Sequence, residues 1–382
     1  MQSPIQAIKA HHEKRKTLKK GEKLPTWALV FYGVGAFALV MFLLCIANPH
    51  FADWFNGSFS QALRFLTAKL TGWIPFSLSE LLIYLIVPVL IWALVIGMRK
   101  YSNTWKQTGI YAATLFSVVA LIFSLFALTL GGGYHTSSLY DRLEIRQQTV
   151  DSENLLATTQ TVRDKLNTLA QSTLIQYDTS DFSILPMTWN ELQEEILTSY
   201  KTVSGEYKAV RTFRSNVKPV LLSEVMSLAH ITGVYSFYTG EANLNARFTD
   251  YTVPFTMAHE MAHQRGFARE DEANFIAFLV CIHSANPYVR YSGYLTLYDY
   301  LLGALYEDDQ EAYNEEIQQM DRKVLSEMIA QNKFFARYEN STTSKIAGAI
   351  SDSVLKLQGT EGIKSYGLVV NLAIAYYQNG NP

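Results

Sequence analysis

The chain has 382 residues, of which 49% are hydrophobic and 17% are charged, and its formal net charge is −2. Soluble domains usually carry about 25% charged residues, and a near-neutral chain lacks the basic surface of a nucleic-acid-binding protein. The two cysteines, Cys45 and Cys281, lie far apart in apolar runs, which excludes a disulfide framework and a thiolate metal site. The composition therefore favours a membrane protein that has no nucleic-acid partner.

Three long uncharged runs in the first third of the chain predict transmembrane helices. The expected spans are about 25–47, 80–98 and 109–131, and each is long enough to cross a hydrocarbon layer of about 30 Å. Pro88 lies inside the second run, where a transmembrane helix tolerates it because neighbouring groups can bond the freed carbonyl. The first run is too long for the apolar core of a cleaved signal peptide, so we expect an uncleaved anchor. Buried helices of a soluble protein are the less favoured alternative.

The basic residues predict how these spans are oriented. Residues 1–23 hold seven Lys or Arg and two Glu, and the loop between the second and third spans is also basic. Basic segments stay on the cytoplasmic side. We therefore expect a cytoplasmic tail at 1–23, a membrane module at 24–134, and an extracytoplasmic domain at 135–382, in a bacterial cytoplasmic membrane. Residues 55–78 are aromatic-rich and predict either an interfacial helix with a turn or an ordinary loop.

The last two thirds of the chain predict a mainly α domain with a small β element. Residues 139–207 have a helical pattern, with a capping box at Thr188–Glu191, and Pro219 is expected to open another helix. Residues 233–254 favour short strands or extended loops, because aromatic, Gly, Asn and Thr residues dominate there. Beyond them the pattern is helical almost to the end, where the apolar run 366–377 predicts a core helix.

The segment 259–263 reads HEMAH and carries the clearest chemical signal. His259 and His263 are four residues apart, so on a helix they share one face and can bind one Zn²⁺ through two imidazoles. Glu260 lies beside them and is placed to act as the general base that deprotonates the attacking water. The flanking apolar pattern favours a helix, and Gly266 offers its C-cap. The alternative is a structural helix with two surface histidines.

A catalytic zinc site needs a third protein ligand and leaves one position open. The nearest candidates are the acidic residues that follow the motif, and two more distant histidines remain possible. These candidates are Glu270, Asp271, Glu272, His230 and His283. For the carboxylates, the alternative is a solvated helix N-terminus that the helix dipole favours.

The segment EDEANFIAF, residues 270–278, resembles the E-x-x-A-N/D element of HExxH zinc peptidases of the gluzincin type. The membrane CAAX-prenyl endopeptidases carry E-x-x-A-D, and the repressor-cleaving peptidases of the ImmA/IrrE type carry E-x-x-A-N. The resemblance implies a zincin-like metallopeptidase domain in which Glu270 is the third zinc ligand and Asn274 orients a ligating imidazole. The sequence departs from these families in its shorter spacing between the two motifs, and Arg269 occupies the position of the third histidine of the metzincins. Glu272 therefore stays an alternative ligand.

Over most of its length the chain is similar to an uncharacterised family of bacterial membrane proteins, catalogued as a domain of unknown function. The similarity rests on the N-terminal spans, on IPFSLSE and FYTGEANLN, on PFTMAHEMAHQRGFAREDEANFIAFL, and on a late SYG. That family is regarded as zincin-like from its HExxH motif. The similarity implies a fold and a metal but no substrate.

Together these patterns predict a membrane-anchored zinc metallohydrolase with Glu260 as the catalytic residue and a peptide or protein as substrate. Two other interpretations stay open: a non-catalytic, zinc-stabilised receptor or scaffold, and an amide hydrolase that acts on peptidoglycan or a lipid-linked envelope substrate. Similarity to gluzincins implies that residues 241–248 pair with the substrate backbone, and an ordered loop is the alternative. A peptidase also needs a donor to the developing oxyanion. The candidates by residue type are Tyr235, Tyr238, Tyr251, Arg265 and His230.

Overall fold

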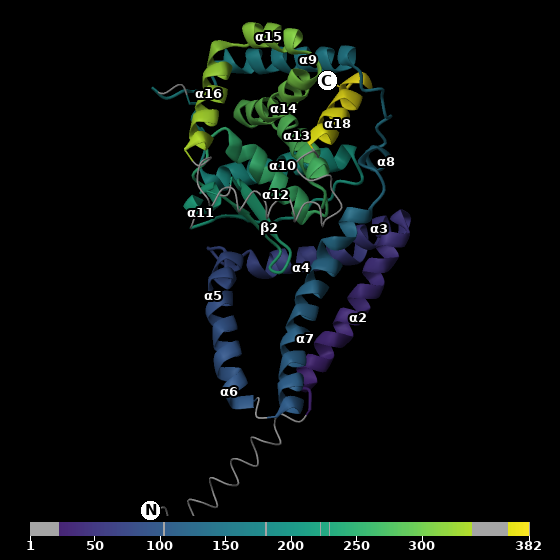
Figure 1. The fold of residues 1–382 in the computed structure, drawn as a ribbon. Helices are drawn as coiled ribbons and strands as arrows, with labels where there is room; N and C mark the ends of the chain where they lie inside the picture. The colour runs from purple at the N-terminus through teal and green to yellow at the C-terminus, as the bar shows by residue number, and fades with distance from the viewer. Residues whose placement is uncertain are drawn as a thin grey trace, which may run out of the picture.

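The computed structural model describes residues 23–101, 104–179, 182–221, 223–228, 230–337 and 366–381. The predicted tail at 1–23 lies, apart from its last residue, outside the described residues. A largely helical body stands on three long helices that diverge toward it (Figure 1). The fold class is the one that the sequence predicts, because the described chain is mainly α-helical and carries one small sheet.

Three helices are long and apolar enough to cross a membrane, at Thr26–Ala47, Leu78–Val95 and Trp105–Thr129. They confirm the three apolar helices that were predicted, within a few residues at each end. The first and third are α2 and α7. The second consists of α5 (Leu78–Trp92) and the start of a π-helical segment, η2 (Ala93–Gly97), after which the chain continues as α6 (Met98–Tyr101). Their apolar side chains are largely exposed, as lipid-facing side chains must be.

Small residues let α2 and α7 pack closely along their length. A Cβ added at Gly35 on α2 would lie only 3.2 Å from the Cβ of Ala120 on α7. Such close backbone approach is the usual way in which helices associate in a bilayer. The pair therefore forms one unit, and α5 stands apart from it (Figure 1).

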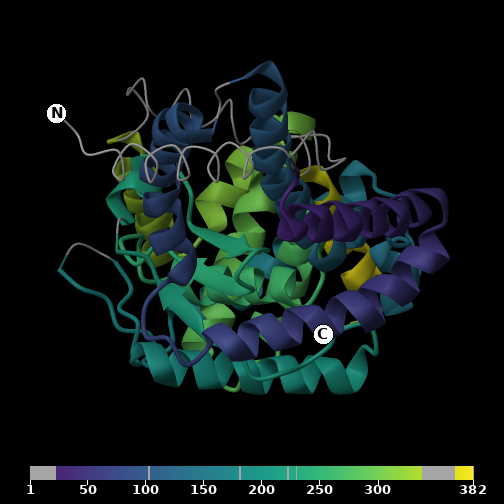
Figure 2. The same cartoon turned by 90° about the horizontal axis from the view of Figure 1, so that it is seen from below.

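A short helical layer joins the spans to the body. It consists of α3 (Pro49–Phe55), a π-helical turn η1 (Asn56–Ser60), α4 (Gln61–Thr71) and the 3₁₀ turn η3 (Gly131–His135). The helix and turn predicted within 55–78 are confirmed, and α4 lies across the membrane-side face of the body (Figure 2). Helix α7 stops at Thr129, just before the glycines that begin η3.

The body is a bundle of helices around a central one, α13 (Glu270–Ile282), most of which is buried. The capping box at Thr188 and Glu191 is present and opens α10. The C-terminal helix packs on α13, with Tyr376 against Phe275 and Phe278, which confirms the predicted core helix. The surrounding helices are α8 (Leu139–Leu143), α9 (Ser152–Ala170), α10 (Trp189–Glu206), α12 (Thr252–Gln264), α14 (Pro287–Asp308), α15 (Gln310–Gln319), α16 (Arg322–Ala336) and α18 (Tyr366–Gln378).

A three-stranded sheet lies beside α12, in the order β1-β3-β2. The strands are β1 (Val217–Pro219), β2 (Gly233–Ser236) and β3 (Glu241–Leu244). The expectation that Pro219 opens a helix is wrong. Pro219 instead ends β1 opposite Leu244, and α11 begins only at Ser223 and ends at Leu228. Proline is tolerated there because β1 is an edge strand with one neighbour.

The strand order also corrects the expectation for residues 241–248. Their strand, β3, is the central one: it pairs in parallel with β1 and antiparallel with β2. Both of its edges are therefore occupied, so it cannot pair with a substrate backbone. In the described part of the chain, β1 and β2 each keep one unpaired edge, and β2 lies beside α12.

Candidate metal centre

A tight turn brings the end of α12 back toward the start of α13. The turn centres on Gly266, whose φ of +99° is a conformation that side chains other than glycine adopt with strain. Backbone bonds from Gly266 to His263 and from Phe267 to Ala262 close it. The chain then enters α13 at Glu270. The short spacing between the two sequence motifs is thus the length of one compact turn.

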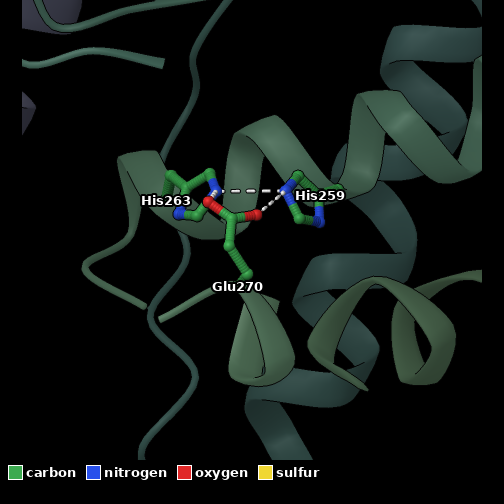
Figure 3. Close-up of side chains that lie close together, drawn as sticks. All are labelled: His259, His263 and Glu270. Carbon is green, nitrogen blue, oxygen red and sulfur yellow. Dashed lines mark hydrogen bonds and ion pairs between the residues drawn. The ribbon is translucent and has the colours of Figure 1, made fainter. Parts of the chain in front are cut away.

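This turn brings together His259, His263 and Glu270. The two Nε2 atoms lie 3.0 Å apart, and the carboxylate oxygens of Glu270 lie 3.2 Å from Nε2 of His259 and 3.5 Å from Nε2 of His263. Figure 3 shows both rings projecting from α12, with the carboxylate reaching toward them from α13. Within the described residues, these three form the group of His, Cys, Asp and Glu side chains that is able to hold a metal ion.

The hydrogen bonds of His263 leave its Nε2 atom available. Its Nδ1–H donates to the carbonyl oxygen of Phe267 at 2.7 Å, so the lone pair of a neutral ring lies on Nε2. Backbone acceptors of this kind commonly orient metal-binding imidazoles. For His259, Nδ1 is buried and has no hydrogen-bond partner in the described structure. Asn274, proposed from resemblance to orient an imidazole, lines the same cleft.

Contacts within this group shift the pKa values of Glu270 and His263. Burial would raise the pKa of Glu270, but the charges and hydrogen bonds of His263 and His259 outweigh it and hold that pKa below its usual range. Burial would likewise lower the pKa of His263, but the Glu270 carboxylate outweighs it and raises that pKa to about 9. The Glu270 carboxylate therefore stays ionised, and its charge is balanced by a cation, either a proton on an imidazole or a metal ion.

The spacing of these atoms fits a divalent metal. A tetrahedral zinc ion with bonds of about 2.0–2.1 Å holds its ligand atoms about 3.3–3.4 Å apart, and the three distances here are 3.0, 3.2 and 3.5 Å. Two imidazole nitrogens that face each other at 3.0 Å repel through their lone pairs unless a cation lies between them. Two imidazoles and one carboxylate are also a common ligand set of catalytic zinc.

The other candidates for the third ligand point elsewhere. Glu272 is buried and forms ion pairs with Arg142 and Arg269. His283 lies at the far end of α13, where its Nε2 is 3.2 Å from Glu206, and His230 lines the cleft but is not in the group.

Glu260 lies beside the group and faces the same cleft. Its side chain is 3% exposed, one carboxylate oxygen has no hydrogen-bond partner among the described residues, and burial raises its pKa to about 7 against the opposing charges of His259 and His263. It packs against the backbone of β2, since a Cβ added at Gly233 would lie 2.6 Å from Cγ of Glu260. A carboxylate with a pKa near neutrality can both accept and donate a proton at physiological pH.

The group lies in a cleft of about 980 Å³ between β2, α12, α14 and α16. Among the candidate oxyanion donors, Tyr235, Tyr251 and His230 line this cleft. Tyr238 does not line it, and Arg265 is packed against the rings of Tyr200 and Phe213.

Sequence reasoning missed several cleft residues. Asp299 and Glu307 of α14 line the wall, as does Gly233. The spacing of the two acids places them on one helical face, but nothing in the sequence indicates that this face turns toward the motif. Gly233 occurs at a predicted strand, where a glycine can mark a close approach of another group.

Comparison with known proteins gives a family but no activity. A search of the curated proteins and of the solved structures finds no match. A family model described as "Protein of unknown function (DUF3810)" matches residues 55–374, from the end of α3 into α18. The match covers the second and third apolar helices, the sheet and the whole candidate metal-binding group. The chain therefore belongs to the DUF3810 family of proteins of unknown function.

Proposed function

We propose that this protein is a membrane-anchored, zinc-dependent metallohydrolase of the HExxH type, and that it hydrolyses an amide bond in a peptide. One observation carries the proposal: the two Nε2 atoms and the Glu270 carboxylate converge at one end of a cleft, with Glu260 beside them. The donor set and the distances are compatible with zinc. The proposed site resembles that of gluzincins, but with a shorter turn between His263 and Glu270.

Each residue has a distinct role in the proposed reaction. His259, His263 and Glu270 would hold the metal. When bound, zinc supplies Lewis acidity, which makes a water molecule more acidic and a carbonyl carbon more electrophilic. Glu260 accepts the proton of the attacking water and then delivers it to the leaving nitrogen, a role for which its place beside the three ligands suits it.

Two features favour a catalytic site with a peptide substrate over a purely structural metal site. A structural zinc site is closed by four protein ligands, whereas here three ligand side chains border an open cleft. The cleft also runs along β2, whose outer edge is unpaired in the described structure. An extended peptide can add to such an edge through main-chain hydrogen bonds.

We propose further that the tail is cytoplasmic and that the body lies outside a bacterial cytoplasmic membrane. Basic loops support this orientation. Thr149, which follows the third span and is exposed, is a suitable reporter, because the native Cys45 and Cys281 are both buried. Thr149→Cys should react with a membrane-impermeant thiol reagent in intact spheroplasts. Labelling seen only after lysis would place the body in the cytoplasm.

The proposed metal site is tested by elemental analysis of the detergent-purified protein. We expect about one zinc per chain in wild type and in Glu272→Gln, and little in Glu270→Gln. Glu272 serves as the matched control because it is the same residue type two positions away, with arginines as its partners. Wild type that neither contains nor takes up zinc would reduce the motif to a helix with two histidines.

The catalytic step is tested with Glu260→Gln and a library of peptide substrates. We expect this variant to keep its zinc and to lose at least about a hundredfold in turnover, the usual contribution of a general base. Turnover that survives in Glu260→Gln would refute the mechanism. Zinc without turnover on peptides, in wild type, would favour a zinc-stabilised scaffold or an amide hydrolase of envelope substrates.

A further inference from the structure

The turn between the two metal-binding helices is held by the membrane module. Asn56, in η1 just before α4, donates a hydrogen bond from Nδ2 to the carbonyl oxygen of Gly266 at 3.0 Å. These residues are 210 positions apart in the sequence, and both are buried. Gly266 is the centre of the turn that separates His263 from Glu270. A residue beside the spans therefore contacts the backbone that sets the geometry of the metal centre.

Arg64, on α4, fixes the orientation of the Asn56 side chain. Its Nη1 donates to Oδ1 of Asn56 at 2.9 Å, and its Nη2 donates to the Asn56 carbonyl at 2.8 Å. Because Oδ1 is occupied by the guanidinium, the amide must turn its N–H toward Gly266. Arg64 is fully buried and also donates to the carbonyl of Thr129, at the end of α7. It thus ties α4, the third span and the metal turn together.

Steric contacts restrict the turn from two further directions. A Cβ added at Gly266 would collide with the Arg64 guanidinium and lie 3.0 Å from Oδ1 of Asn56. A Cβ added at Gly133, in η3, would lie 2.9 Å from the carbonyl oxygen of Gly266 and 2.9 Å from Cβ of Ala268. The turn therefore lies between α4 on one side and η3 on the other.

We propose that Asn56 and Arg64 are positioning residues of the metal centre, so that the membrane module sets the separation of His263 and Glu270 and does more than anchor the body. The inference rests on the proposed zinc site. Loss of the Asn56 hydrogen bond frees the turn, which lets Glu270 drift from the two imidazoles. The affinity for zinc then falls although all three ligands remain.

The test measures zinc affinity by competition with a chromophoric chelator in detergent, on wild type, Asn56→Ala and Asn56→Asp. The aspartate variant keeps an acceptor for Arg64 but places an oxygen against the Gly266 carbonyl, so it preserves the contact with the guanidinium while removing the bond donated to Gly266. We expect both variants to bind zinc about 10–100-fold more weakly, the usual effect of losing a group that supports a metal ligand. Circular dichroism and thermal unfolding of the zinc-free proteins report on the fold separately.

Asn216→Ala is the matched control. Asn216 also joins the body to the membrane module through one bond from Nδ2 to a backbone carbonyl, in this case that of Gly72 at 2.7 Å. That contact lies at the opposite end of α4, away from the metal turn. We expect Asn216→Ala to keep the affinity of wild type within about twofold, because it leaves the Gly266 turn untouched.

The outcomes separate the inference from the proposed function. Wild-type affinity in a folded Asn56→Asp, or an equal loss in Asn216→Ala, overturns the positioning role while leaving the zinc site intact. Wild type that binds no zinc overturns both. The Co²⁺-substituted proteins add a second readout, because their visible spectrum reports ligand geometry: it should change in Asn56→Asp and stay unchanged in Asn216→Ala.

Discussion

Two buried charged clusters lie near the junction of the body and the membrane module, and they are built in opposite ways. In the first, Lys218 and Glu241 form an ion pair whose side chains are 4% and 1% exposed. Lys218 also donates to the carbonyl of Thr71, and Glu241 accepts bonds from the backbone N–H groups of Leu78 and Ser79 at the start of α5. This cluster joins β1 and β3 to the second span.

In the second cluster, at the candidate metal centre, the charges converge but not every polar atom has a hydrogen-bond partner. One oxygen of Glu260 and Nδ1 of His259 have no hydrogen-bond partners among the described residues, and the cluster faces the cleft. Buried polar atoms are nearly always paired in proteins, so unpaired ones call for an explanation. The difference separates two uses of buried charge. The completed cluster, in which Lys218 and Glu241 are both hydrogen-bonded, stabilises the fold. The incomplete cluster, in which Glu260 and His259 keep unpaired atoms, is available to a ligand.

The largest effect should come from breaking the completed cluster. Lys218→Met keeps the length of the side chain but leaves the Glu241 carboxylate buried without its cation. Removing one partner of a buried ion pair usually costs about 3–5 kcal/mol. We therefore expect a fall of that size in the free energy of unfolding, measured by denaturant titration in detergent.

The control for Lys218→Met is Arg214→Met, which breaks the exposed Arg214–Glu194 pair. Exposed pairs contribute little because solvent screens them, so its unfolding midpoint should match that of wild type. Equal effects in the two variants would show that the buried cluster has no special structural role. Zinc binding by the folded fraction, as proposed for wild type, should survive in both, because neither residue belongs to the candidate metal centre.

A smaller effect should come from disturbing the incomplete cluster without removing a charge. Gly233→Ala places a methyl group 2.6 Å from Cγ of Glu260, so the carboxylate must move. Displacing a general base by a fraction of an ångström lowers the rate, and we expect about a tenfold loss of turnover, or about 1.4 kcal/mol. The zinc content should stay that of wild type.

Gly303→Ala is the control for the shift of Glu260. Gly303 lines the same cleft from α14, but an added Cβ there meets no atom within 4 Å. Its replacement should leave turnover unchanged and slightly stabilise the helix. Equal turnover in Gly233→Ala and wild type would argue that Glu260 does not act from its observed position.

The local patterns of the sequence were sufficient for most of the fold. The apolar helices, the capping box at Thr188 and the buried C-terminal helix depend on residues close to one another in the chain, so composition and spacing predict them. Pro219 was assigned wrongly because its strand depends on pairing with β3, some 25 residues later. A local pattern carries no information about that partner.

The candidate site was predictable to the same extent. The spacing of His259 and His263 follows from helix geometry alone. The choice between Glu270 and Glu272 as the third ligand does not follow from helix geometry. It depends on Arg142, which pairs with Glu272 and lies 130 positions earlier in the chain. The Asn56 contact to Gly266 crosses an even longer stretch of sequence. Local patterns supply the chemical groups here, and tertiary contacts decide which of them meet.

A buried carboxyl group, that of Glu327, gives a third case for the comparison, and we expect the smallest effect there. Glu327 is fully buried and is bonded to the Ser183 backbone N–H at 3.0 Å and to the Tyr291 hydroxyl at 2.7 Å, without an ion-pair partner in the described structure. Burial raises its pKa above the ordinary value of 4.5, although these hydrogen bonds oppose the shift. The folded protein therefore holds this proton at pH values where the unfolded chain has lost it.

The consequence is a pH dependence with a definite sign. As pH rises from about 4.5 through the raised pKa of Glu327, the unfolded state releases a proton that the folded state keeps, so this group's contribution to stability falls. Glu327→Gln resembles the protonated carboxyl and cannot titrate. We therefore expect the variant to gain stability relative to wild type as pH rises through that window, in denaturant titrations at a series of pH values. A difference between the two proteins that is independent of pH would mean that Glu327 is ionised in the fold like an ordinary carboxylate, and that its hydroxyl partners complete the cluster as fully as Lys218 completes that of Glu241.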